Sequence, residues 1–196
     1  MMLKNDLKSI MKNPQLTKGV NAYRMIKDRF ELAVNKTQPA FKQRGIDQDI
    51  IFVSVFKEFY GLKGPMYDDV FINGYFNLFN AYLADYRKTH NVPKYDDVLK
   101  KLRDIPNNGK KTYQPVFATK LIHTFNNNAP IYDSVVGDEH FGYSRSNFDY
   151  KKYCSEIKQY ANSSEGKKII KAFDRCFPKS GITKVKKIDF VLWVDR

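Results

Sequence analysis

Apolar residues recur every three or four positions along most of the chain, which is the spacing of amphipathic helices. In residues 14–36, five such positions share one helical face, and Pro14 suits the first turn of a helix. The pattern predicts a mostly or wholly α-helical protein. Helices are expected over residues 3–12, 14–36, 46–61, 64–89, 94–105, 114–125, 149–162, 163–177 and 182–195.

Two of these segments also contain runs of β-branched residues, which favour a strand. In residues 46–61, the length of the run and a terminal Gly61, a natural helix C-cap, favour a buried helix. In residues 182–195, the apolar spacing favours a helix, and a strand over residues 189–194 is the alternative. Residues 106–115 combine Pro, Asn-Asn-Gly and two lysines, which predicts a loop with a positive tip. Residues 134–148 are expected to be irregular.

No linker rich in Pro, Gly or Ser divides the chain, which indicates a single compact, multi-helix domain over residues 1–196. An alternative division treats residues 1–44 as a basic, helical N-terminal appendage and residues 45–196 as the core.

The charge balance is strongly positive. The chain has 34 Lys and Arg against 21 Asp and Glu, a net charge of +13. Residues 1–44 carry a net +7 and residues 149–196 a net +6. Such a surplus attracts polyanions, and the 15 Phe and 13 Tyr include candidates for stacking on bases. The charge therefore indicates a nucleic-acid partner, and the alternative is a soluble protein that is simply rich in lysine.

Several function classes find no support in the sequence. The two cysteines and three histidines lack metal-ligand spacing, and no Walker loop, dinucleotide fingerprint or HExxH motif is present. We therefore expect no metal and no cofactor. The first residues contain no continuous apolar run, and no apolar stretch is long enough to cross a bilayer. These features predict a cytoplasmic protein without a membrane partner.

Lys120 and Asp133 are the candidate catalytic residues. Lys120 is expected near the start of a helix, where the helix dipole and burial both favour a neutral, nucleophilic amine that forms Schiff bases. Asp133 follows a tight turn among apolar neighbours, where its carboxylate would stabilise a developing cation. The plainer alternative is that Lys120 extends to solvent and that Asp133 only caps the following helix.

The stretch "ATKLIHTFNNNAPIYDSVV" resembles the signature of the helix-hairpin-helix DNA glycosylase superfamily, especially its 8-oxoguanine glycosylase branch. The resemblance covers residues 94–136 and, more loosely, the C-terminal helices. It implies an all-α fold with a helix-hairpin-helix element, whose first helix is "KYDDVLKKLRDI". Thr119 and Lys120 match the Thr-Lys pair of the lyase members. Asp133 of "PIYD" matches the carboxylate needed for glycosidic bond cleavage.

The chain departs from the family at the hairpin. Family members usually have Gly-x-Gly, whose backbone N–H groups approach a DNA phosphate, whereas residues 115–118 here are Pro-Val-Phe-Ala. Lys110 and Lys111, just upstream, are the candidates to contact phosphate instead. The turn between Lys120 and Asp133 is also shorter than is usual, and no cysteine cluster of the iron–sulfur branch follows.

The leading hypothesis is a DNA glycosylase with AP lyase activity that removes a damaged or modified base, flipped out of double-stranded DNA, including bases altered in phage DNA. Lys184, Lys186 and Lys187 of "KVKK", together with Lys110, Lys111 and Thr119, are its predicted nucleic-acid contacts. One alternative is a non-enzymatic nucleic-acid-binding protein on the same helical scaffold, for which phage defence is a candidate context, with RNA as another ligand. A helical protein–protein adaptor is the third reading.

Overall fold

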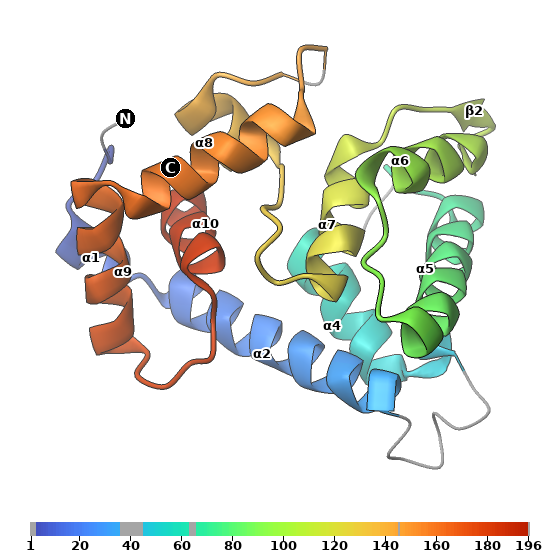
Figure 1. Cartoon of the computed structure of the whole chain (residues 1–196), viewed down its shortest axis with the longest axis horizontal. Coiled ribbons are helices and arrows are strands. Elements are labelled where there is room, and N and C mark those ends of the chain that lie inside the picture. Colours follow the sequence, from blue (N-terminus) through green and yellow to red (C-terminus); the bar gives the residue numbers. More distant parts are fainter. Residues whose placement is uncertain (1–2, 36–44, 63–65, 145, 196) are drawn as a thin grey trace. The chain divides into compact units, whose positions relative to one another are not determined.

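The computed structural model describes residues 3–35, 45–62, 66–144 and 146–195, and the expected all-α fold is confirmed (Figure 1). The predicted boundary at residue 44 lies outside the described residues. The helices and strands are α1 (Leu7–Met11), α2 (Pro14–Asn35), η1 (Ile46–Gln48), α4 (Ile50–Tyr60), α5 (Asp69–Thr89), α6 (Tyr95–Asp104), β1 (Pro106–Asn107), β2 (Lys110–Lys111), α7 (Pro115–Phe125), η2 (Ser134–His140), α8 (Tyr150–Asn162), α9 (Ser164–Cys176) and α10 (Lys184–Val194).

Contacts within the chain group it into two compact units. Unit 1 combines Met1–Val20 with Asn126–Arg196, and unit 2 is Asn21–Phe125. Unit 1 is therefore built from two distant stretches of sequence, whereas unit 2 is continuous. Each unit has its own buried core.

Aromatic rings form the core of unit 2. Phe56 of α4 contacts the rings of Tyr75, Phe76 and Phe79 of α5, with centroid distances of 5.9–6.0 Å. Phe117 of α7 contacts Tyr75 at 5.7 Å, and α6 packs against α7 and α5. Phe71, Tyr75, Phe76 and Phe79 of α5 are thus core residues of unit 2.

The ends of α4 explain why residues 50–60 form a helix despite their β-branched run. The Asp49 side chain accepts a hydrogen bond from the Phe52 N–H at 3.1 Å, and Arg29 pairs with the same carboxylate at 2.7 Å. At the other end, Gly61 adopts the left-handed conformation (φ 67°) that glycine accepts without a steric penalty. The prediction of a helix with Gly61 as its C-cap is confirmed.

The expected loop at residues 106–115 contains a small hairpin instead. Strands β1 and β2 pair antiparallel across Asn108 and Gly109, both of which have positive φ (50° and 73°). Two central residues with positive φ match the twist of paired strands, which is why Asn-Gly forms the tightest hairpins. Hydrogen bonds from the Asn107 side chain to Met66 O (2.9 Å) and from Asn108 N to Asp68 (2.6 Å) tie the hairpin to the start of α5.

Helices α8, α9 and α10 pack against one another and form most of unit 1. Phe173 of α9 and Phe190 of α10 lie stacked at 6.1 Å, and both are buried. Residues 184–194 are helical, so the predicted helix is confirmed over the strand alternative. The segment expected to be irregular contains η2, a π-helix that packs against α10.

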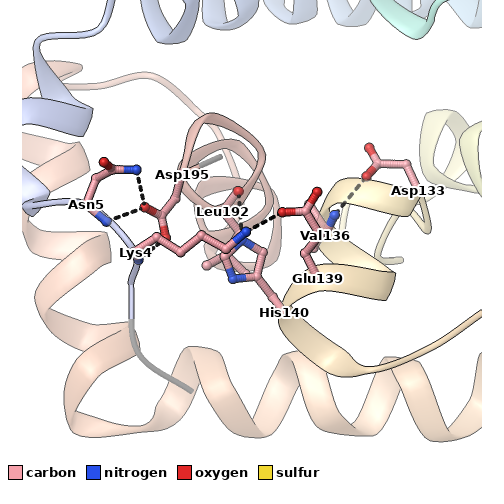
Figure 2. A network of polar contacts seen from close by, with 8 residues as sticks. All are labelled: Lys4, Asn5, Asp133, Val136, Glu139, His140, Leu192 and Asp195. Atoms are coloured by element: carbon pink, nitrogen blue, oxygen red, sulfur yellow. Dashed lines mark hydrogen bonds and ion pairs between the residues drawn. The ribbon is translucent and has the colours of Figure 1, made fainter.

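A buried carboxylate joins the two stretches of sequence within unit 1. Asp195, which is fully buried, accepts hydrogen bonds from the backbone N–H groups of Lys4 and Asn5, each at 2.7 Å, and from the Asn5 side chain at 3.0 Å (Figure 2). The Lys4 side chain pairs with Glu139 of η2, and His140 contacts the carbonyl oxygen of Leu192 in α10 at 3.1 Å.

Replacing the carboxylate of Asp195 tests this arrangement. We expect Asp195→Ala to lower the free energy of unfolding by about 1.5–3 kcal/mol, because the N–H donors lose a charged acceptor. Denaturant unfolding followed by circular dichroism measures the change. An unfolding curve that matches the wild-type curve would contradict the structural role of Asp195.

Candidate functional site

Lys120 lies in the middle of α7, not in its first turn. The helix begins at Pro115, so five helical residues precede Lys120, and the prediction that Lys120 starts a helix is wrong. The physical reason is that proline fits the first helical position, where its missing N–H costs nothing. The positive end of a helix dipole acts mainly within the first turn, so it contributes little at Lys120.

The ammonium group of Lys120 is buried in unit 2 and hydrogen-bonded there. The residue is 8% exposed, and its Nζ donates a hydrogen bond to the carbonyl oxygen of Tyr60 at 2.8 Å. The Nζ atom also lies 5.2 Å from the ring centroid of Phe117 and 5.6 Å from that of Tyr60. Tyr60 is the last residue of α4, and the last carbonyls of a helix have no partner within it. Lys120 therefore caps the C-terminal end of α4, and its ammonium group lies over the rings of Phe117 and Tyr60.

Asp133 belongs to unit 1, where it is half-buried. Its carboxylate accepts a hydrogen bond from the Val136 N–H at 2.9 Å and so caps the start of η2 (Figure 2). Burial raises the pKa of the Tyr153 phenol well above its ordinary value, and the negative charges of Asp189 and Asp133 raise it further. Lys120 and Asp133 lie in different units, so their pairing in one active site stays a prediction.

The other predicted contacts in unit 2 differ in exposure. Lys110 and Lys111 are exposed on β2, and Lys111 pairs with Asp104 at 3.3 Å. Thr119 is fully buried, and its hydroxyl donates to the carbonyl oxygen of Val116 at 2.9 Å. The two lysines of the hairpin are therefore open to solvent. Thr119 is buried, and its hydroxyl is bonded to the backbone of its own helix.

The three lysines of "KVKK" have three different surroundings at the start of α10. Lys184 is exposed. Lys186 is only 3% exposed, and its Nζ pairs with Asp189 at 2.5 Å and lies 4.5 Å from the Phe190 ring centroid. Lys187 pairs with Asp174 of α9 at 2.6 Å. Of the three, Lys184 alone is both exposed and without an ion pair within the described part of the chain.

Lys184 borders a basic groove in unit 1 that the sequence analysis missed. Two open hollows, of about 480 and 530 Å³, adjoin each other and share Ala161, Asn162 and Lys184 in their linings. We call them together the α8–α10 groove. Its exposed cations come from the end of α8, from one face of α9 and from the start of α10, and they are Lys158, Lys167, Lys171, Arg175 and Lys184.

These five cations have no ion pair with any carboxylate that the structure describes, in contrast to Lys186 and Lys187. Asp174 is the one carboxylate among the described lining residues, and Lys187 neutralises it. The groove is therefore strongly positive. Lys167, Lys171 and Arg175 are four residues apart, and this i, i+4, i+8 spacing is the signal by which the sequence could have revealed them.

The described residues contain no group of three or more His, Cys, Asp or Glu side chains able to hold a metal ion. None of their helices is both long enough and apolar enough to span a bilayer.

Comparison with known proteins finds no matching family model, no matching curated protein and no matching solved structure. The resemblance to helix-hairpin-helix glycosylases thus stays a prediction from the residues that carry it.

Replacing Lys120 separates its structural role from any role in chemistry. We expect Lys120→Met, which keeps most of the apolar stem, to lower the free energy of unfolding by about 1–3 kcal/mol, because the buried Tyr60 carbonyl loses its donor. Lys100→Met, at an exposed position of α6, is the matched control and should change stability by less than about 0.5 kcal/mol. Equal unfolding curves for the two variants would contradict the capping role.

Proposed function

We propose that this protein binds nucleic acid and that the α8–α10 groove is the contact surface. The observation that carries the proposal is the row of five exposed, unpaired cations along one groove of unit 1. When these side chains neutralise the phosphates of a nucleic acid, they release the cations condensed on it, and this release drives binding. Nucleic acid is the polyanion that the overall charge of +13 also favours.

The arrangement of charges on α9 supports a ligand-binding role. Like charges four residues apart on a helix destabilise it by about 0.2–0.5 kcal/mol per pair. Lys167 and Lys171 form one such pair, and Lys171 and Arg175 form another. A bound phosphate chain removes the repulsion, which gives the three cations a function.

Charge reversal in the groove tests the proposal against a control of equal charge. Lys167→Glu with Lys171→Glu should weaken binding to a random-sequence DNA duplex at least tenfold at low salt, because two positive groups become repulsive. The control, Lys151→Glu with Lys168→Glu, changes exposed lysines of α8 and α9 that do not line the groove. Fluorescence anisotropy measures both affinities. Equal losses in the two variants would show that only net charge matters, and would contradict the groove as the contact surface.

Glycosylase and AP lyase chemistry is the second candidate function, favoured by the setting of Lys120. Lys120 is only 8% exposed, and desolvation of the amine is one way in which lysine nucleophiles are activated. In the proposed step, the Lys120 ammonium gives one proton to solvent, and the neutral amine leaves Tyr60 O and attacks C1′ of a flipped nucleotide. The bond from C1′ to the base breaks, the base leaves with its bonding electrons and takes a proton from the newly bonded nitrogen, and Asp133 stabilises the cationic sugar. The C1′–O4′ bond then opens, O4′ takes a proton, and a Schiff base joins Lys120 to C1′.

Borohydride trapping tests this chemistry. Reduction of the Schiff base on abasic or lesion-bearing duplexes should leave a covalent protein–DNA adduct, visible by gel electrophoresis. Lys120→Met should abolish the adduct while binding stays within about twofold, since the groove is in the other unit. Asp133→Asn should slow base release more than it weakens binding. If a folded, DNA-binding wild-type protein forms no adduct with any of these duplexes, the lyase hypothesis is abandoned.

A further inference from the structure

We infer that the α8–α10 groove binds the phosphodiester backbone of one strand at successive phosphates and reads no bases. The inference rests on the proposed function and specifies its ligand chemistry. It predicts binding that is independent of sequence, in contrast to the recognition of a single flipped base.

The first argument is the continuity of the groove. One hollow is lined by Lys167, Lys171 and Arg175 of α9, and the other by Lys158 of α8 and Thr183 before α10. Lys184 lines both hollows, so the positive charge continues from one into the other. A chain of linked anions can occupy both hollows at once, whereas one compact anion can occupy only one of them.

The second argument is the spacing of charge along α9. Four residues of an α-helix advance by about 6 Å, so the three cations of this face form a line rather than a cluster. A linear array of single charges fits a ligand whose own charges are arranged in a line. The phosphates of a nucleic-acid strand are such an array.

The third argument is the chemistry of the lining. The described lining residues include no Phe, Tyr or Trp, although Phe and Tyr are abundant in the chain. Proteins that hold bases in single strands stack them on aromatic side chains, and those that read base edges use forked or bidentate groups. The groove offers four lysine ammonium groups, which act as point charges, one guanidinium, that of Arg175, and two amides, those of Asn128 and Asn162. The Asn162 amide already donates to the carbonyl oxygen of Lys158 at 3.0 Å, so the cations outnumber the amides that could read a base edge. This composition suits phosphate oxygens.

The salt dependence of binding tests the inference, with one variant for the cations of α9 and one for the cations of α8 and α10. Lys167→Gln, Lys171→Gln and Arg175→Gln together remove the α9 cations of the first hollow, and Lys158→Gln with Lys184→Gln removes the cation of the second hollow and the one that both hollows share. The slope of log K against log salt falls by about 0.9 for each duplex phosphate contact that is lost. We expect each variant to reduce the slope by about one or more, and their combination to reduce it by about the sum. Lys151→Gln with Lys168→Gln is the control and should leave the slope within about 0.3 of the wild-type value.

Three unrelated duplexes in DNA form and the same three in RNA form complete the experiment. Affinities that agree within about threefold among the sequences support backbone recognition, and preference for DNA or RNA identifies the source of the phosphates. Inorganic phosphate at millimolar concentration should not displace the duplex, because it occupies one position only.

The outcomes separate this inference from the proposed function. A wild-type protein that binds no duplex contradicts both. A wild-type protein that binds, with slopes unchanged by neutralising either hollow, contradicts the inference and leaves nucleic-acid binding to another surface. The inference is also contradicted if the wild-type protein prefers one sequence by tenfold or more and the groove variants lose this preference. The groove would then read bases.

Discussion

A charge that leaves water must find a partner inside the protein, and this constraint organises both units. Transferring an unpaired charge to an apolar interior costs far more than a domain's net stability. The buried charges here meet the requirement in different ways: Lys120 bonds to a helix carbonyl, Lys186 pairs with Asp189, and Asp195 accepts backbone N–H groups. Each partnership also fixes an element, namely the end of α4, the start of α10 or the segment before α1.

The same constraint distinguishes lysines that serve the fold from lysines that serve a ligand. A buried, paired lysine has its hydrogen bonds committed, so it can act on a substrate only after losing them. An exposed and unpaired lysine gives up only water and counterions when a polyanion arrives. By this criterion Lys186 is a structural residue, whereas Lys184, two positions earlier, is available for binding. Lys120 is committed as well, and chemistry at its amine requires the bond to Tyr60 to open.

Local patterns were sufficient to predict most of the helices. The apolar spacing located α2, α5 and α9, and Gly61 marked the end of α4 because it adopts a left-handed conformation. The hairpin at Asn108 was missed although its Asn-Gly turn is also a local signal. The surroundings of individual lysines were beyond local patterns. Successive helical residues are about 100° apart, so Lys184 and Lys186 point in nearly opposite directions. Reading "KVKK" as one basic patch ignored this rotation, and the groove required α8, α9 and α10 to be assembled first.

The hydrogen bonds of Asp195 also bear on the order in which the chain acquires its structure. They close a loop of about 190 residues, from Asn5 to Asp195. Unit 2 is continuous from Asn21 to Phe125, so it can form from contacts within a growing nascent chain. Unit 1 needs both of its stretches and must wait until α10 has been synthesised. Until then α1 lacks α9 and α10, the two helices against which it packs in the folded protein.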